Sequence, residues 1–234
     1  MRLVSVNTGL PREVMWRGQA VLTGIFKQPV AGRVVVREFN LDRDRQADLS
    51  VHGGKNKAVY AYPLAHYDFW RSELPDHELP MGVFGENLTV DGLSEDVVHI
   101  GDRFSVGSAE LVATQPRMPC YKLGIRFGMD EMVVRFRAAR RTGVYFAVSR
   151  EGELGEGDCL ELLAPDPNAV PISEITRLYL AKSGSAADEA ALQRVLLTEA
   201  LPDGWREYFR AKLKELTIAP TEKALGFGDR RTTR

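Results

Sequence analysis

Short apolar or alternating runs, separated by glycine and proline, recur along the chain from the N-terminus to Leu163. They lie in Met1 to Val6 and then at 19–23, 32–36, 57–62, 87–90, 103–106, 110–114, 143–148 and 159–163. Many short strands at such a spacing are typical of a closed or folded-over β-barrel. The pattern therefore predicts a mainly β fold for this part of the chain.

Two stretches within this region have a helical period instead. Pro63 to Leu74 begins with a proline, a residue that the first turn of a helix accepts. In Met129 to Arg141, the apolar residues Met132, Val133 and Phe136 share one helical face. We expect both stretches to form helices that interrupt the strands.

The period changes again after the proline-containing segment Ala164 to Pro167. Helical apolar stripes follow at 172–182, at 186–198 with Ser185 as the N-cap, and at 202–216. These patterns divide the chain into three parts. We predict a β-barrel domain over residues 1–164, a three-helix module over 165–220 and a frayed tail over 221–234.

The charge balance bears on the partners. Residues 165–234 contain 11 Lys and Arg against 10 Asp and Glu, and the whole chain has a formal net charge of −1. Neither balance favours nucleic acid as a partner. We therefore expect the three-helix module to act in protein interaction, with homodimer formation as one possibility.

Neither a membrane nor a structural metal cluster is expected from the sequence. No apolar stretch approaches the length of a membrane span, and the N-terminal residues have no signal-peptide pattern. We therefore expect a cytoplasmic protein. Its two distant cysteines and four scattered histidines lack the spacing of a zinc site or of a cysteine-ligated iron–sulfur cluster.

One cysteine lies in an unusual segment, Gln115 to Leu123, which contains two prolines and an arginine. The prolines stiffen the approach to Cys120. A helical turn can begin directly after it, and Arg117 and Lys122 are close in sequence; both effects favour a thiolate. A free cysteine is more commonly a small buried apolar residue. Here the composition of the segment favours a loop that approaches a ligand.

The other cysteine is a useful contrast. Cys159 lies in an apolar, strand-like run that extends to Leu163. Such a run needs no function to explain it, because cysteine is frequently a core residue. Cys120 is therefore the candidate for chemistry.

Two glycine-containing loops could also approach a ligand. In Asp48 to Lys57, the Gly53-Gly54 pair allows close backbone approach, and lysines could meet a phosphate. In Met81 to Leu88, a glutamate and Asn87 at a strand start could read the hydrogen-bonding edge of a heterocycle. Taken alone, each loop is better explained as an ordinary turn.

Taken together, these segments resemble the MOSC domain, a family related to the C-terminal domain of molybdenum cofactor sulfurase. The resemblance covers most of residues 1–164. It is carried by Asp48 with His52-Gly53-Gly54, and by the segments 60–63, 82–88, 101–102 and 115–120. With the three-helix module added, the chain is similar to the YiiM-type branch of the family.

The resemblance implies a β-barrel that binds the molybdenum cofactor, with Cys120 as the protein ligand of the metal. This agrees with the thiolate interpretation, because molybdenum accepts soft sulfur ligands. The resemblance also implies that Asp48 handles protons or supports a ligand, as a candidate catalytic residue beside Cys120. It further implies cofactor contacts from His52, Gly53, Gly54, Lys57, Asn87, Arg117 and Tyr121.

The activity implied is that of an oxidoreductase that reduces N-hydroxylated compounds, such as hydroxylaminopurines and amidoximes. We expect a separate reductase to supply the electrons, because the chain has too few cysteines for an iron–sulfur relay and no Gly-x-Gly-x-x-Gly motif after a strand. Two alternatives remain open. Cys120 could carry sulfur as a persulfide, or the chain could be a non-catalytic protein that senses the cofactor and signals through its helices.

Overall fold

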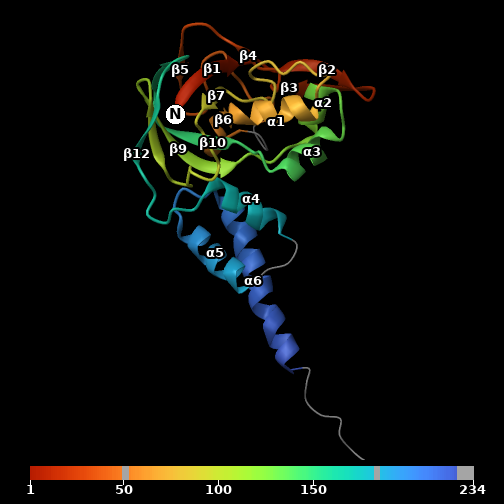
Figure 1. Ribbon diagram of the computed structural model, residues 1–234, viewed down its shortest axis with the longest axis vertical. Helices are drawn as coiled ribbons and strands as arrows, with labels where there is room; N and C mark the ends of the chain where they lie inside the picture. Colours follow the sequence, from red (N-terminus) through yellow and green to blue (C-terminus); the bar gives the residue numbers. More distant parts are fainter. Residues whose placement is uncertain (49–52, 182–184, 226–234) are drawn as a thin grey trace, which may run out of the picture.

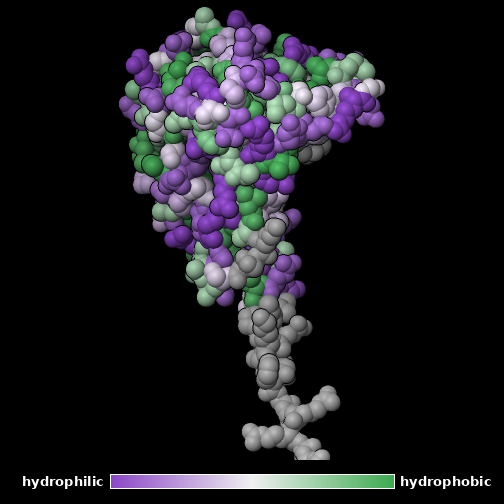
Figure 2. Space-filling view, turned by 45° about the vertical axis from the view of Figure 1, so that its right-hand side comes forward, coloured by the Kyte–Doolittle hydropathy of each residue, from purple (hydrophilic) through white to green (hydrophobic). Residues whose placement is uncertain are grey.

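The computed structural model describes residues 1–48, 53–181 and 185–225, with side chains up to residue 217. His52, one of the expected cofactor contacts, lies outside the described residues. None of the described helices is both long enough and apolar enough to cross a membrane. The face in Figure 2 mixes hydrophilic and hydrophobic residues over its whole area.

The main sheet has eight strands in the order β12-β8-β9-β10-β6-β7-β1-β4. All neighbouring strands are antiparallel except β6 and β7, which are parallel. The strands are β1 (Arg2–Thr8), β4 (Gln28–Pro29), β6 (Val59–Pro63), β7 (Leu88–Asp91), β8 (Arg103–Val106), β9 (Ala109–Pro116), β10 (Val144–Arg150) and β12 (Leu160–Ala164). Two separate ribbons pair β2 (Arg12–Trp16) with β3 (Gln19–Thr23), and β5 (Arg33–Val36) with β11 (Gly152–Gly155).

The prediction of a closed barrel is wrong for the described residues, because their sheet is open. Its ends approach at one point, where Arg2 and Cys159 form a single antiparallel bridge. Three backbone hydrogen bonds join the two segments there. Leu3 donates to the carbonyl of Asp158 and accepts from Gly157, and the N–H of Leu160, the first residue of β12, donates to the Met1 carbonyl, all at 2.9 Å. These contacts amount to one isolated bridge, and β1 and β12 are not neighbours in the sheet.

The mainly β class is also corrected to a mixed α/β fold, since helix and strand each account for 30 % of the residues. Three helices belong to the β-rich part: α1 (Ala65–Glu73), α2 (Tyr121–Phe127) and α3 (Met132–Ala139). They pack with β6 through an aromatic cluster, in which the Trp70 and Phe136 rings stack with centroids 5.8 Å apart. The predicted helices at 63–74 and 129–141 are thereby confirmed.

The C-terminal helices are α4 (Ile172–Leu180), α5 (Ala186–Leu197) and α6 (Asp203–Leu225). Ser185 caps α5 as predicted, in a reciprocal capping box with Asp188. The last helix continues past its expected end at residue 216. Figure 1 shows these helices together at one end of the sheet, with α6 leading away from it.

The helices at this end share one hydrophobic core with the sheet. Phe209 of α6 is fully buried in the same cluster as Phe104 of β8 and Phe146 of β10. α4 also packs directly against β9. Folding of the helices is therefore expected to be coupled to folding of the sheet.

We expect Phe209→Ala to lower the free energy of unfolding by about 3–5 kcal/mol, because it leaves a cavity in this shared core. Urea unfolding followed by circular dichroism and tryptophan fluorescence should show one cooperative transition. The matched control is Phe39→Ala, at a side chain that is 50 % exposed, where the change should stay within about 0.5 kcal/mol. Two separate transitions would contradict the coupling.

Candidate functional site

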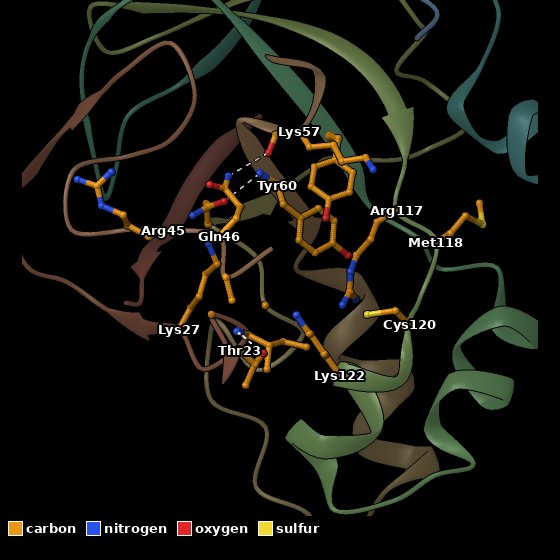
Figure 3. Close-up of a pocket in the computed structure, with 16 residues that line it drawn as sticks. Thr23, Lys27, Arg45, Gln46, Lys57, Tyr60, Arg117, Met118, Cys120 and Lys122 are labelled. Atoms are coloured by element: carbon orange, nitrogen blue, oxygen red, sulfur yellow. Dashed lines mark hydrogen bonds between the residues drawn. The ribbon is translucent and has the colours of Figure 1, made fainter. Parts of the chain in front are cut away.

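A cavity of about 90 Å³ opens where the loop after β9 meets η1 (Lys55–Lys57) and the loop that follows β3. Figure 3 shows Lys27, Lys122 and Cys120 directed toward the same space. The residues that line it are Thr23, Gly24, Ile25, Lys27, Arg45, Gln46, Ala47, Lys57, Tyr60, Gly85, Asn87, Arg117, Met118, Cys120, Lys122 and Tyr145.

Cys120 is placed by the end of one element and the start of the next. β9 ends at Pro116, and α2 begins at Tyr121, directly after Cys120 in extended conformation (φ −121°, ψ 173°). The Leu123 N–H donates to the Cys120 carbonyl at 2.9 Å, which closes the first turn. The expected helical turn after Cys120 is thereby confirmed. Cys120 is half-buried and not disulfide-bonded, whereas Cys159 is exposed.

Arg117 brings a buried positive charge to the cavity. Its side chain lies between two aromatic rings, with the guanidinium carbon 5.2 Å from the Tyr60 centroid and 5.4 Å from that of Phe136. The residue is 6 % exposed, and Nη1 has no hydrogen-bond partner in the described part of the chain. A guanidinium cannot discharge by losing a proton. No described carboxylate forms an ion pair with Arg117, and because a buried charge needs compensation, the cavity favours an anionic ligand.

Two lysines add to this charge. Lys122 is 8 % exposed, and its amino group makes no hydrogen bond or ion pair with any other described residue. Burial lowers the pKa of Lys57, while the charge of Cys120 acts in the opposite direction. Lys57 and the sulfur of Cys120 are therefore electrostatically coupled across the cavity.

A third lysine is already paired within the protein. The Lys27 amino nitrogen lies 2.5 Å from Asp44 Oδ2. Burial lowers the pKa of Lys27, and the carboxylate of Asp44 opposes that effect. Asp44 also accepts a hydrogen bond from the Gly9 N–H at 2.9 Å. Lys27 therefore contributes less uncompensated charge to the cavity than Arg117 or Lys122.

Asn87 lines the cavity, but its side-chain amide hydrogen-bonds to other residues of the protein. Its Oδ1 accepts from the Tyr60 N–H at 3.1 Å, and its Nδ2 donates to Asp44 at 2.9 Å and to the Asn7 carbonyl at 3.3 Å. Asn87 thus holds the cavity wall in place.

The glutamate beside it, Glu86, is also used internally. It is fully buried and accepts from the N–H groups of Gly82 and Phe84, at 2.8 and 3.1 Å, and from the hydroxyl groups of Thr89, at 3.0 Å, and Tyr67. The carboxylate of Glu86 is therefore used to hold the loop from Met81 to Leu88 together. It is not available to hydrogen-bond the edge of a heterocycle, as the sequence had suggested.

The structure brings Cys120, Lys57, Asn87 and Arg117 together at one cavity. Of the other residues expected at the site, Gly53 and Gly54 line a neighbouring groove instead. Tyr121 is 55 % exposed and does not line the cavity. Asp48 is half-buried and directly follows Ala47, which does line it.

Several lining residues were not identified from the sequence as site residues. Lys27 and Arg45 lie in charged loops, which resemble solvated surface, and Lys122 was noted only as a neighbour of Cys120. Gly24 was also missed, although a β-carbon there would lie 2.4 Å from the Arg45 carbonyl. A glycine next to a predicted strand end is the only local signal for this close approach.

The MOSC domain family model matches residues 48–161. A Bacillus subtilis (strain 168) protein, YflK, is 39 % identical over 92 % of this chain and 95 % of its own length. The crystal structure of YiiM from Geobacillus stearothermophilus has 31 % identity and a TM-score of 0.75, over 91 % of this chain and 98 % of the other. A Gibberella moniliformis (strain M3125 / FGSC 7600) protein named Reductase is 29 % identical over 86 % of this chain, which spans 36 % of that protein.

The open sheet, the cationic cavity and these matches define the class, and the chain belongs to the MOSC domain family. Within the family it is YiiM-like, as the resemblance in its sequence indicated. This agreement confirms the family prediction.

The lowered pKa of Lys57 predicts a pH dependence of anion binding. Only the protonated amine attracts an anion, so affinity for inorganic phosphate should fall as pH rises, beginning below the ordinary lysine value of 10.5. Calorimetry across this range should show a smaller decline for Lys57→Arg, because a guanidinium keeps its proton. Superimposable pH profiles for the two proteins would contradict this role of Lys57.

Proposed function

We propose that the chain is a molybdenum-cofactor-binding oxidoreductase that reduces N-hydroxylated compounds with electrons from a separate reductase. One observation carries the proposal: Cys120 shares a cavity with Arg117 and Lys122, two buried cations that form no ion pair with a carboxylate among the described residues. The fungal relative named Reductase supports the broader class of oxidoreductase.

The residues present fit this cofactor. Its metal is bound by dithiolene sulfurs and accepts a further soft ligand, which the Cys120 thiolate would provide. Its phosphate is an anion, which Arg117, Lys122 and Lys57 would hold by charge-assisted hydrogen bonds. The unpartnered Nη1 of Arg117 is a donor that such an anion would satisfy. When bound, the cofactor supplies a two-electron centre that takes oxygen from an N–O group.

The chain's own residues would then divide the remaining work. Cys120 would hold the metal from the N-terminus of α2, and Arg117, fixed between its two rings, would orient the phosphate. Asp48, in the loop beside the cavity, would move a proton to the departing oxygen. Electrons would come from a flavin- or nicotinamide-dependent partner, since two cysteines are too few for an internal iron–sulfur relay.

We predict that Cys120→Ser abolishes molybdenum retention and leaves the fold intact, because a hydroxyl is a harder and less acidic ligand of similar size. Elemental analysis after expression with molybdate in a cofactor-competent host measures this directly. Cys159→Ser, at the exposed cysteine, is the matched control and should retain the metal. Normal metal content in the Cys120 variant would show that the ligand is assigned wrongly.

Turnover tests the reaction. Cofactor-loaded protein with a chemical one-electron reductant should reduce a hydroxylamino base, whereas NADH or NADPH alone should give no product. If the loaded protein stays inert with strong reductant across several N-hydroxylated substrates, and sulfur passes from Cys120 to an acceptor, a persulfide carrier replaces the proposed enzyme.

Arg117→Ala should lower cofactor occupancy at least about tenfold, since one charge-assisted hydrogen bond contributes about 1.5–3 kcal/mol. The control is Arg194→Ala, at an exposed position of α5 outside the cavity. Occupancy is read from the absorbance of the released pterin. Equal occupancy in the two variants would remove Arg117 from the phosphate site.

A further inference from the structure

A wider hollow lies beside the Cys120 cavity. It has a volume of about 440 Å³, and we call it the helix groove. Lys57 and Met118 line both the groove and the cavity. The other lining residues are Gly53, Gly54, Lys55, Asn56 and Gln115 from the β-rich part, and Tyr179, Pro202, Gly204, Trp205 and Tyr208 from the C-terminal helices.

At the groove, Gln115 has a fixed and unsatisfied amide. Its Oε1 accepts from the Trp205 indole N–H at 2.6 Å. Because an indole nitrogen can only donate, the oxygen must face Trp205 and the amide nitrogen must face elsewhere. Gln115 is 3 % exposed, and its Nε2 has no hydrogen-bond partner among the described residues. A buried donor without an acceptor lowers the stability of the folded protein by about 1–3 kcal/mol. A ligand with an acceptor at this position would therefore be favoured.

The residues that the C-terminal helices contribute to the groove are largely aromatic. The ring of Tyr179 meets Trp205 edge to face, with centroids 5.2 Å apart, and lies 5.2 Å from the ring of Tyr208. Tyr208 remains 39 % exposed. Such a wall suits a flat ring, because aromatic pairs gain energy beyond the area they bury.

We propose that the helix groove binds a flat heteroaromatic ring with a hydrogen-bond acceptor on its edge. Nε2 of Gln115 donates to that acceptor, and the aromatic wall packs against the ring. Because Met118 and Lys57 line both the groove and the Cys120 cavity, the two spaces are neighbours, and the proposal places a substituent of the ring on the side toward the cavity. If the proposed function holds, the ring is that of an N-hydroxylated base. The C-terminal helices are then part of the substrate site.

The groove is also the larger of the two spaces, at about 440 Å³ against about 90 Å³. The cavity at Cys120 is thus left for cofactor groups and the N–O substituent, and the bulk of a purine is held outside it. This division predicts that ring recognition and metal binding depend on different residues.

The test is direct binding of adenine and 6-hydroxylaminopurine to the purified full-length chain, measured by calorimetry and by quenching of tryptophan fluorescence. Gln115→Glu keeps an oxygen for Trp205 but replaces the donor with an acceptor, so it should weaken ring binding at least about tenfold. Gln193→Glu, the same change at an exposed position of α5, should leave binding unchanged.

A second variant avoids placing a carboxylate in a buried position. Gly204 lies in the first turn of α6, and a β-carbon there would meet no atom within 4 Å. Gly204→Leu should therefore fold normally, as checked by its melting temperature, and should block the ring by filling the groove. Cys159→Ser, at the exposed cysteine outside the groove, should bind the ring like the unmodified chain.

Two results would overturn the inference: no ring binding by the unmodified chain, or ring binding by Gln115→Glu and Gly204→Leu as tight as that of the unmodified chain. If the ring binds as expected but loaded protein never turns over an N-hydroxylated base, the groove stands and the proposed function fails. The binding and turnover measurements therefore separate the two.

Discussion

The side-chain amide of Asn87 connects three parts of the chain that are distant in sequence. It bonds to Tyr60 at the start of β6, to the carbonyl of Asn7 in β1, and to Asp44 in the loop that follows β5. Asp44 in turn holds Lys27. Asn87, Tyr60, Asn7 and Asp44 are all buried, where an unpaired polar group is costly and a satisfied network is rigid. The position of the cavity wall depends on this single amide.

Within this frame, the cavity concentrates positive charge. Arg117 keeps its proton even when buried, and the rings of Tyr60 and Phe136 stabilise it only in part. A bound anion would relieve the remaining cost. Because a ligand that binds only the folded state adds to stability, cofactor loading and thermal stability should be linked in this protein.

The strand β9 connects this cavity to the C-terminal helices. Gln115 near its end reaches Trp205 of α6, and the chain then turns through Pro116 toward Cys120. With Phe209 buried in the core shared by sheet and helices, the helices cannot move independently of the strand that leads to the cysteine. Packing of the helices against the sheet therefore helps to fix the position of Cys120.

Local features were determined by the sequence alone. The strands at 19–23 and 103–106, the Ser185 cap and the helical turn after Cys120 lie where the sequence predicted them, because each depends on neighbouring residues and a short period. Other features were decided only by the tertiary structure. The sheet is open, with β12 and β4 at its two edges, and Lys122 is buried beside a cavity that Lys27, Tyr60 and Tyr145 also line. Burial and pairing depend on residues far apart in the chain, which no local period records.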